Sequence, residues 1–366
     1  MKSFSQNLAI FTILCLLTII FYSCNQQNRK MKIRGIKIYR MPSNPDSASS
    51  LLKNIGINTI FSSQELNSHS EYQDLIEEYR FNNFVITPIF YDPSALEKDS
   101  TLWSQTVKGA RAEKDWLKFV CPSRSNFRDQ KVEEIKKIVM TYNPDGISLD
   151  FIRFFVFWEK VYPDTPADSL PQTCFCENCL QDFQNKSGLK IPYSLNQKSQ
   201  IYKWINENHC QKWINWKCDL ITSMVEEIVT ETRKIDKDLK INIHVLPWRE
   251  SDFGGAIKNV AGQNIETISP YVDFISPMTY AHMVKQDSRW IQNVFNEMDR
   301  RAPGKILPAV QVAKTYRNFS LSPDDFQKNI QAVKESSASG IIIWSWSALS
   351  KSQDKQKVLE KIIQKK

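Results

Sequence analysis

Asp150 and Arg153 are the residues of this 366-residue chain best placed to do chemistry, because they end an apolar run. The run covers residues 146–154 and begins at a Pro-Asp-Gly turn, so we expect a buried strand. A carboxylate buried at the end of a strand is costly unless a cation or a ligand compensates its charge. Asp150 is therefore either a catalytic carboxylate or the partner of Arg153 in an ion pair that fixes the following loop.

Cys174, Cys176 and Cys179 form a second group, with the spacing of a metal site. Three thiolates this close together can bind one tetrahedral zinc ion, which then takes its fourth ligand from elsewhere in the chain. Cys121 is the candidate for that ligand. A zinc ion held by four thiolates has no open position for a substrate, so we expect a structural metal and a reaction that requires no cofactor.

Eight short apolar runs would position these residues, and helical segments lie between them. The predicted strands are 33–39, 57–62, 84–91, 146–154, 241–247, 272–280, 306–312 and 340–347. The predicted helices include 49–54, 72–79, 131–142, 201–233, 257–268, 290–300, 324–336 and 354–363. Such units fit a single (β/α)8 TIM barrel, whose strands are buried on both faces, with a Cys-rich insertion after the fourth strand. The alternative is an open doubly wound sheet, but no glycine-rich phosphate loop follows the first predicted strand.

The predicted strand ends carry aromatic, amide and acidic residues, which gather at one rim in a barrel of this type. Those expected to contact a ligand are Asp92, Arg153, Trp248, Tyr280, His282, Gln311, Trp344 and Trp346. Aromatic faces pack against the C–H faces of sugar rings, and carboxylates and amides bind hydroxyl groups, so we expect a carbohydrate ligand. Trp344 and Trp346 lie two residues apart on one predicted strand, so they should line the mouth together or pack together.

Hydrolysis of a glycosidic bond uses two carboxyl groups, so Asp150 needs a partner. Glu250 follows the fifth predicted strand and is our candidate for the acid/base, with Asp150 as nucleophile. Arg153 would keep Asp150 ionised, and Tyr280 would form a hydrogen bond near the anomeric carbon. Alternatively, Glu250 is a solvated loop residue or a charge at the start of the next helix. The other candidates for the partner are Asp252 and Asp92.

Three of the predicted strands resemble those of the glycoside-hydrolase-like barrel lipoproteins. They are 145–154 (DGISLDFIRF), 272–280 (VDFISPMTY) and 340–346 (GIIIWSW). The resemblance covers essentially the whole chain after its N-terminal segment, and it implies a TIM barrel that acts on glycosides. It also implies that Asp150, at the end of the fourth strand, is a catalytic carboxylate.

Two other families share single features with this chain. The Met-x-Tyr that ends at Tyr280 is similar to that of chitinase-like barrels, but Ser148 and Ile152 stand where those enzymes carry an aspartate and the catalytic glutamate. Chitinase chemistry is therefore not expected. The placement of Cys121 before the fourth strand and of the cysteine triplet after it resembles the zinc cluster of the cysteine-cluster β-galactosidases. Those enzymes carry Asn-Glu where this chain has Asp150, so the resemblance implies the metal site and not the activity.

Gln311 ends the seventh predicted strand, where many glycosidases carry a nucleophilic glutamate. An amide cannot attack the anomeric carbon, so that arrangement does not apply to this chain. Because this strand lacks a nucleophilic glutamate, an alternative from another functional class stays open: a catalytically inactive barrel that binds glycans at the membrane.

The N-terminus has the pattern of a bacterial lipoprotein signal peptide over residues 1–23. Lys2 precedes the apolar run 8–21, and Ser23 stands directly before Cys24, which resembles a lipobox. We expect cleavage before Cys24, a lipid on its thiol, a polar tether over 24–31 and the barrel over 32–366. The protein would then be anchored in the bacterial cell envelope, facing the periplasm or the cell surface. The alternative is an uncleaved membrane anchor, although the run is short for a span.

The charge distribution bears on possible nucleic-acid partners, and the predicted export bears on the state of the cysteines. The net charge of +8 is spread along the chain without the basic stripe of a nucleic-acid-binding protein, so no nucleic-acid partner is expected. Exported proteins are oxidised, so disulfides could instead pair Cys121, Cys174, Cys176, Cys179, Cys210 and Cys218. The two cysteines of a C-x-C unit seldom serve separate disulfides well, which favours zinc.

Overall fold

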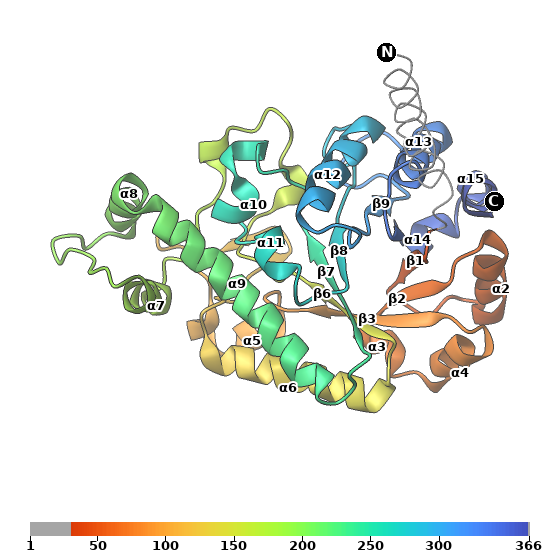
Figure 1. The fold of residues 1–366 in the computed structure, drawn as a ribbon, viewed down its shortest axis with the longest axis horizontal. Helices are drawn as coiled ribbons and strands as arrows, with labels where there is room; N and C mark the ends of the chain where they lie inside the picture. Colours follow the sequence, from red (N-terminus) through yellow and green to blue (C-terminus); the bar gives the residue numbers. More distant parts are fainter. Residues whose placement is uncertain (1–30, 365–366) are drawn as a thin grey trace, which may run out of the picture.

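Eight parallel strands form the centre of the computed structural model, which describes residues 31–364 (Figure 1). They are β1 (Ile33–Ile38), β2 (Thr59–Ser63), β3 (Asn82–Pro88), β6 (Gly146–Asp150), β7 (Lys240–Val245), β8 (Phe274–Pro277), β9 (Ala309–Gln311) and β10 (Gly340–Trp344). The strands pair in the order β8-β7-β6-β3-β2-β1-β10-β9, and parallel bridges between the segments of β8 and β9 join the two ends of the sheet. The predicted (β/α)8 barrel is thereby confirmed in place of an open doubly wound sheet.

The strands read as continuous apolar runs because both of their faces are covered. All five residues of β6 are buried, and so are the last five of β7. Glycine stands where the first and last strands approach most closely: a Cβ atom at Gly340 would lie 1.9 Å from the carbonyl oxygen of Ile33. Any larger residue at position 340 would push β1 and β10 apart, so the closure of the barrel depends on this glycine.

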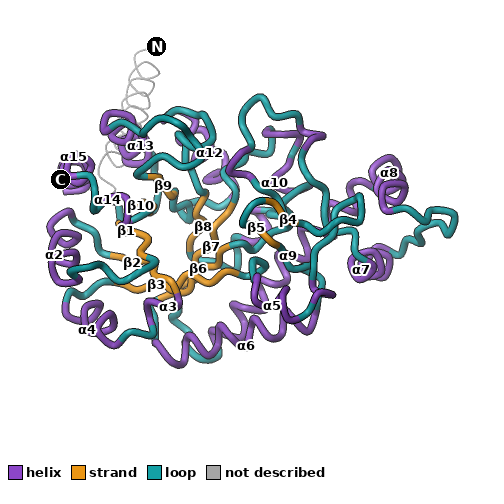
Figure 2. Tube along the Cα trace, turned by 180° about the vertical axis from the view of Figure 1, so that it is seen from behind, coloured by secondary structure: helices purple, strands orange, loops and turns teal. Residues whose placement is uncertain are grey.

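Helices surround the strands, and α7 (Glu177–Ser187) and α8 (Lys198–Asn208) project away from the barrel (Figure 2). The helices are α2 (Pro45–Ile55), α3 (Gln64–Asn67), α4 (Ser70–Glu78), α5 (Pro93–Lys98), α6 (Ser125–Tyr142), α7 (Glu177–Ser187), α8 (Lys198–Asn208), α9 (Cys210–Arg233), α10 (Ala256–Asn259), α11 (Ile265–Ile268), α12 (Ser288–Arg301), α13 (Pro323–Lys334), α14 (Trp346–Leu349) and α15 (Gln353–Gln364). In α12 the Asp287 side chain accepts a hydrogen bond from the N–H of Trp290, and the helix buries an apolar stripe that includes Ile291 and Phe295. Capping and amphipathic periodicity together explain this helix.

Three details differ from the sequence prediction. The predicted helix 201–233 is two helices, α8 and α9, because His209 leaves the helical conformation with φ at −142°. The predicted helix 257–268 is split into α10 and α11 around Gly262, whose φ of +71° favours glycine. A hairpin of β4 (Glu113–Lys114) and β5 (Leu117–Lys118), which was not predicted, lies between β3 and β6.

The predicted signal peptide, the lipidated Cys24 and most of the tether lie outside the described residues. Within residues 31–364, none of the helices has the length and apolar character needed to cross a bilayer.

Candidate active site

A cavity of about 340 Å³ lies at the end of the barrel where the strands terminate. Its walls come from the ends of β1, β3, β6 and β10 and from loops that follow the strands. The polar side chains that line it are Lys37, Tyr39, Asp150, Arg153, Glu159 and Tyr280, and the large aromatic ones are Trp116, Phe151, Trp158, Tyr316 and Trp344. Barrels of this fold place their chemistry at this end, so the cavity is the candidate active site.

Asp150 ends β6 and lines the cavity. Its Oδ1 atom accepts a hydrogen bond of 2.8 Å from the N–H of Phe151, and its Oδ2 atom lies 3.9 Å from Nζ of Lys37. Burial raises the pKa of this carboxyl, but His244, Lys37 and the Phe151 N–H more than offset it, so the pKa lies below the usual value. Asp150 is therefore ionised at neutral pH, as a nucleophile or a base must be.

Arg153 is buried in the same cavity and fixes the loop after β6 through backbone contacts. Its Nη1 atom donates hydrogen bonds of 3.0 Å to the carbonyl oxygens of Phe154 and Val156, and its guanidinium lies 4.9 Å from the ring centre of Phe119. Burial lowers the pKa of Arg153 to about 10, so the group stays charged at neutral pH. Among residues 31–364 it forms no ion pair with Asp150 within 4.0 Å, so it fixes the loop through backbone hydrogen bonds and not through the alternative ion pair.

Glu159 is a carboxyl of this cavity that the sequence analysis missed. It lies in the short 3-10 helix η2 (Trp158–Lys160), and only 8% of its surface is exposed. Burial raises its pKa to about 7, because the opposing effect of Arg153 is smaller. The Oε2 atom is buried and has no hydrogen-bond partner among the described residues. One sequence signal was present: a glutamate directly after the apolar run 154–158, where a charge is costly to bury.

Stacked aromatic rings form one wall of the cavity. The ring centres of Tyr280 and Trp344 lie 4.4 Å apart at an interplanar angle of 18°, and Trp158 lies 5.9 Å from Tyr280. The structure thus brings Tyr280 and Trp344, as well as Arg153, of the predicted ligand contacts to the cavity of Asp150. Trp346 was expected to share a strand with Trp344, but β10 ends at Trp344 and Trp346 begins α14, outside the cavity lining.

Trp116 and Tyr316 form a partly exposed edge of the cavity. Trp116 lies between β4 and β5 and Tyr316 follows β9, and the indole Nε1–H donates a hydrogen bond of 2.6 Å to the Tyr316 hydroxyl. Their surfaces are 41% and 37% exposed. Two segments that are distant in sequence therefore meet where a ligand would enter.

His244 is part of the barrel interior and does not line the cavity. Its Nε2 atom lies 3.1 Å from Oγ of Ser148, which also accepts a hydrogen bond from Asn242. Burial lowers the pKa of His244 to about 3, so the ring is uncharged at neutral pH. Lys37 and Arg153 therefore supply the positive charge near Asp150 under those conditions.

Glu250 is not brought to Asp150, contrary to the predicted catalytic pair. Its carboxylate forms ion pairs with Lys258 of α10 and Arg301 of α12, and it is not among the residues that line the cavity. Partial burial raises the pKa of Glu250, but the hydrogen bonds from Arg301 and Lys258 have the larger effect. The pKa therefore lies below the usual value, and the carboxyl stays ionised. A salt-bridged carboxylate is a poor proton donor, so the geometry does not support Glu250 as the acid.

Two predicted ligand contacts are explained by local structure. Asp92 accepts a hydrogen bond from the N–H of Ala95 at the start of α5, and its other oxygen lies 3.1 Å from Nζ of Lys131. Gln311 is fully buried, accepting a hydrogen bond from the N–H of Met283 and donating one to the carbonyl oxygen of Ala313. Neither side chain lines the cavity of Asp150.

The remaining predicted contacts lie in separate depressions. The ring centres of Trp248 and Phe253 lie 5.4 Å apart, and Trp248 lines a pocket together with Arg249. Nη2 of Arg249 forms an ion pair of 2.7 Å with Oδ1 of Asp252. His282 lines another pocket, with its ring 5.0 Å from that of Phe319. The strand order predicted the correct end of the barrel for these residues, but they do not converge on one ligand.

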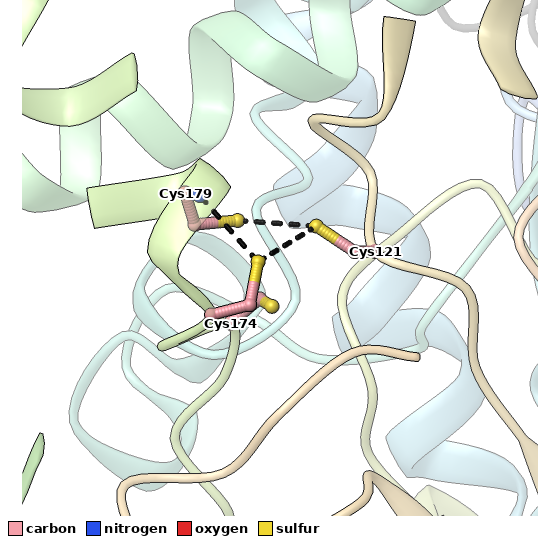
Figure 3. A group of neighbouring side chains, drawn as sticks. Cys121, Cys174 and Cys179 are labelled. Atoms are coloured by element: carbon pink, nitrogen blue, oxygen red, sulfur yellow. Dashed lines mark hydrogen bonds between the residues drawn. The ribbon is translucent and has the colours of Figure 1, made fainter. Parts of the chain in front are cut away.

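The structure gathers the four predicted metal ligands into one buried cluster (Figure 3). The ligand atoms of Cys121, Cys174, Cys176 and Cys179 all lie within 4.8 Å of one another, with Cys121 Sγ 3.3 Å from Cys179 Sγ and 3.4 Å from Cys176 Sγ. In Figure 3 the thiols of Cys121 and Cys179 face each other beside Cys174. These four, with the buried Cys218 and the exposed Cys210, are free thiols, so the structure does not have the alternative disulfides. Four converging sulfur atoms fit a metal ion of tetrahedral preference.

The comparisons with known proteins define the class of fold. No protein-family model matches the sequence, and no curated protein matches it either. Among solved structures, the glycoside hydrolase domain of PgaB (BpsB) from Bordetella bronchiseptica is similar at a TM-score of 0.70 and 10% identity, covering 91% of this chain and 99% of that one.

Two further structures carry related barrels. The β-galactosidase of Marinomonas ef1 is similar at a TM-score of 0.64 and 8% identity, over 91% of this chain and 59% of that one. The chitinase of Chromobacterium violaceum is similar at a TM-score of 0.53 and 9% identity, over 92% and 100%. This chain thus spans little more than half of that β-galactosidase. It has the (β/α)8 fold that these glycoside hydrolases share.

Proposed function

We propose that this chain is a glycoside hydrolase with Asp150 as its nucleophile. The observation that carries the proposal is an ionised carboxylate at the end of the fourth barrel strand, in a cavity with a stacked aromatic wall. Barrel enzymes carry catalytic residues at this position. The likeness of the fold to glycoside hydrolases supports the reaction class.

The residues around Asp150 suit this role. Lys37 and the N–H of Phe151 keep the carboxylate charged and oriented, so that it can attack the anomeric carbon. The stacked rings of Tyr280 and Trp344 form an aromatic wall that suits the C–H face of a sugar. Arg153 holds the loop that frames the cavity.

The test is hydrolysis by the mature chain of a panel of plant, host and bacterial polysaccharides and aryl glycosides, with Asp150→Asn in parallel. Release of sugar by the parent chain and not by the variant, with equal melting temperatures, would support the proposal. Full activity in Asp150→Asn would remove Asp150 from the mechanism.

The alternative is a catalytically inactive barrel that binds glycans. The observation that favours it is the absence, in the described residues, of a carboxylate at the end of β9, where Gln311 is buried in backbone hydrogen bonds. Retention of a glycan on an affinity gel without any hydrolysis would move the assignment to this class.

The cysteine cluster is proposed to bind structural zinc. Cys121, Cys174, Cys176 and Cys179 would supply four thiolates, which fit the tetrahedral preference of zinc and leave no position for substrate. Stoichiometric zinc in the purified protein, measured by elemental analysis, would support the assignment. A protein purified under reducing conditions without any metal would contradict it.

The N-terminal segment is proposed to be a lipoprotein signal with Cys24 as the acylated residue. The protein would then be anchored in the cell envelope, with its carbohydrate ligand outside the cytoplasm. Labelling with radioactive palmitate should mark the parent chain and not Cys24→Ser. Equal labelling of both chains would overturn the proposal.

A further inference from the structure

We propose that Glu159 is the acid/base that works with Asp150, an inference that rests on the proposed glycosidase function. Both carboxyl groups line the same cavity, and both stand on the chain segment formed by β6 and its following loop. No other carboxyl group is among the residues that line this cavity in the described chain. The pair thus supplies the two groups that hydrolysis of a glycosidic bond requires.

The surroundings of the two carboxyl groups favour different protonation states, as a nucleophile and an acid require. Asp150 accepts a backbone hydrogen bond and has the Lys37 ammonium 3.9 Å away, which favours the ionised form. Glu159 is buried beside Trp158 in a loop rich in aromatic residues, and its Oε2 atom has no hydrogen-bond partner among residues 31–364. A carboxyl in such surroundings holds its proton and can donate it to a ligand.

The charged and titratable groups that face Glu159 are Arg153, Asp150 and Tyr280. The positive charge of Arg153 favours ionisation of Glu159, while the negative charge of Asp150 and burial oppose it. Burial is the largest effect, and the pKa is raised to about 7. Glu159 is therefore protonated for the first step in mildly acidic solution, while Asp150 is already ionised.

The reaction sequence is balanced with these two groups and one water molecule. The Asp150 carboxylate forms a bond to the anomeric carbon while the bond to the leaving oxygen breaks, and Glu159 gives its proton to that oxygen. The Glu159 carboxylate then takes a proton from water, whose oxygen attacks the anomeric carbon and releases Asp150. Both carboxyl groups end in their starting states.

A purely structural role for Glu159 would be an ion pair with Arg153. The structure has no such pair within 4.0 Å among the described residues, and Arg153 Nη1 already donates to the carbonyl oxygens of Phe154 and Val156. Fixing the loop therefore does not require the Glu159 carboxylate. A buried carboxyl whose Oε2 atom has no hydrogen-bond partner among the described residues is better explained by a ligand.

The experiment compares Glu159→Gln with the parent chain on two aryl or alkyl glycosides of the sugar that the substrate panel identifies, using the full chain in detergent. One substrate has a good leaving group that needs no proton, and the other has a poor leaving group that does. We expect kcat/KM to fall by about 100-fold or more on the poor leaving group and by much less on the good one. Glu250→Gln is the matched control, because its carboxylate lies in ion pairs outside the cavity, and we expect no selective loss.

The pH profile of the parent chain gives a second readout, which does not require that the Glu159→Gln variant fold. In the parent chain, kcat/KM on the poor leaving group should fall as pH rises through about 7, as Glu159 loses its proton. Equal losses of Glu159→Gln on both substrates, or a parent profile flat between pH 6 and 9, would overturn the role of Glu159 while leaving the glycosidase intact. No hydrolysis of any substrate by the parent chain would overturn the glycosidase and this inference together.

Discussion

Nζ of Lys37 lies 3.9 Å from Oδ2 of Asp150, so the first and fourth strands of the barrel place opposite charges side by side in a buried cavity. Lys37 is 1% exposed and Asp150 is 8% exposed. Burial lowers the pKa of Lys37, but its charge still favours the ionised form of Asp150. The protonation state of Asp150, the proposed nucleophile, therefore depends on a residue of another strand.

Replacing Lys37 with Met should raise the pKa of Asp150, because burial would then be less opposed. The acidic limb of the kcat/KM profile should move to higher pH, since activity needs the ionised carboxylate. Lys131→Met is the matched control, because Lys131 is also a buried lysine paired with an aspartate, Asp92, but it lies outside the cavity. An unchanged acidic limb in Lys37→Met would show that Lys37 does not control Asp150.

Glu159 should make the stability of the protein fall as pH rises. Its pKa is raised to about 7 from an ordinary value of 4.5, so the folded state binds more protons than the unfolded state between those values. The free energy of unfolding should therefore decrease from pH 4.5 to pH 7, by about 3 kcal/mol at most for this group. Urea unfolding of Glu159→Gln should show a weaker pH dependence across this range than the parent chain. Parallel curves for the two proteins would contradict the raised pKa.

Trp116→Ala should raise KM, because it removes an exposed ring at the edge of the cavity and its hydrogen bond to Tyr316. Tyr316→Phe keeps the ring and removes only the hydroxyl acceptor, so it separates ring contact from the link between the two segments. Tyr193→Ala is a suitable control, since that ring is fully exposed on the insertion. We expect about a tenfold rise in KM for Trp116→Ala, about 1.4 kcal/mol, which is of the order of one aromatic contact. A KM equal to that of the parent would exclude Trp116 from ligand binding.

Cys179→Ser should release the metal from the cysteine cluster and lower the melting temperature. Three remaining thiolates bind zinc more weakly, and the loss of metal binding removes free energy from the folded state. Elemental analysis and thermal unfolding with and without a chelator measure both effects. Cys210→Ser is the control, because Cys210 is an exposed thiol outside the cluster. A chelator that removes no metal and leaves the melting temperature unchanged would contradict a structural metal.

The barrel could be predicted from the sequence because parallel strands are buried on both faces and read as apolar runs. The ends of the predicted strands show which residues lie at the rim of the barrel. They do not show which of those side chains point into the cavity. Glu250 follows its strand as expected, yet the loop turns it toward Lys258 of α10 and the distant Arg301 of α12. Glu159 was missed because it follows the strand at a distance, beyond an aromatic run whose folding toward the cavity has no periodic signature.

The cysteine cluster could be predicted because its chemistry depends on local spacing, with only Cys121 supplied from elsewhere. The helix 201–233 could not be divided correctly, because the break at His209 has no proline or glycine to mark it. The ion pair of Arg153 with Asp150, one of the two alternatives for Asp150, is absent from the described residues for a related reason. Nearness in sequence suggested a partner, whereas the guanidinium hydrogen-bonds backbone carbonyls within its own loop.

The cysteine cluster has a consequence for the entropy of the loop that carries Arg153 and Glu159. That loop leaves the barrel at Asp150 and reaches the cluster at Cys174, while Cys121 belongs to the segment before α6. A metal ion bound to the cluster would join Cys121 to Cys174 and so fix both ends of the chain between them. The loop would then have fewer conformations than a loop with free ends. The position of the Glu159 carboxyl would then depend on an ion that never contacts the sugar, and metal content and turnover would fall together.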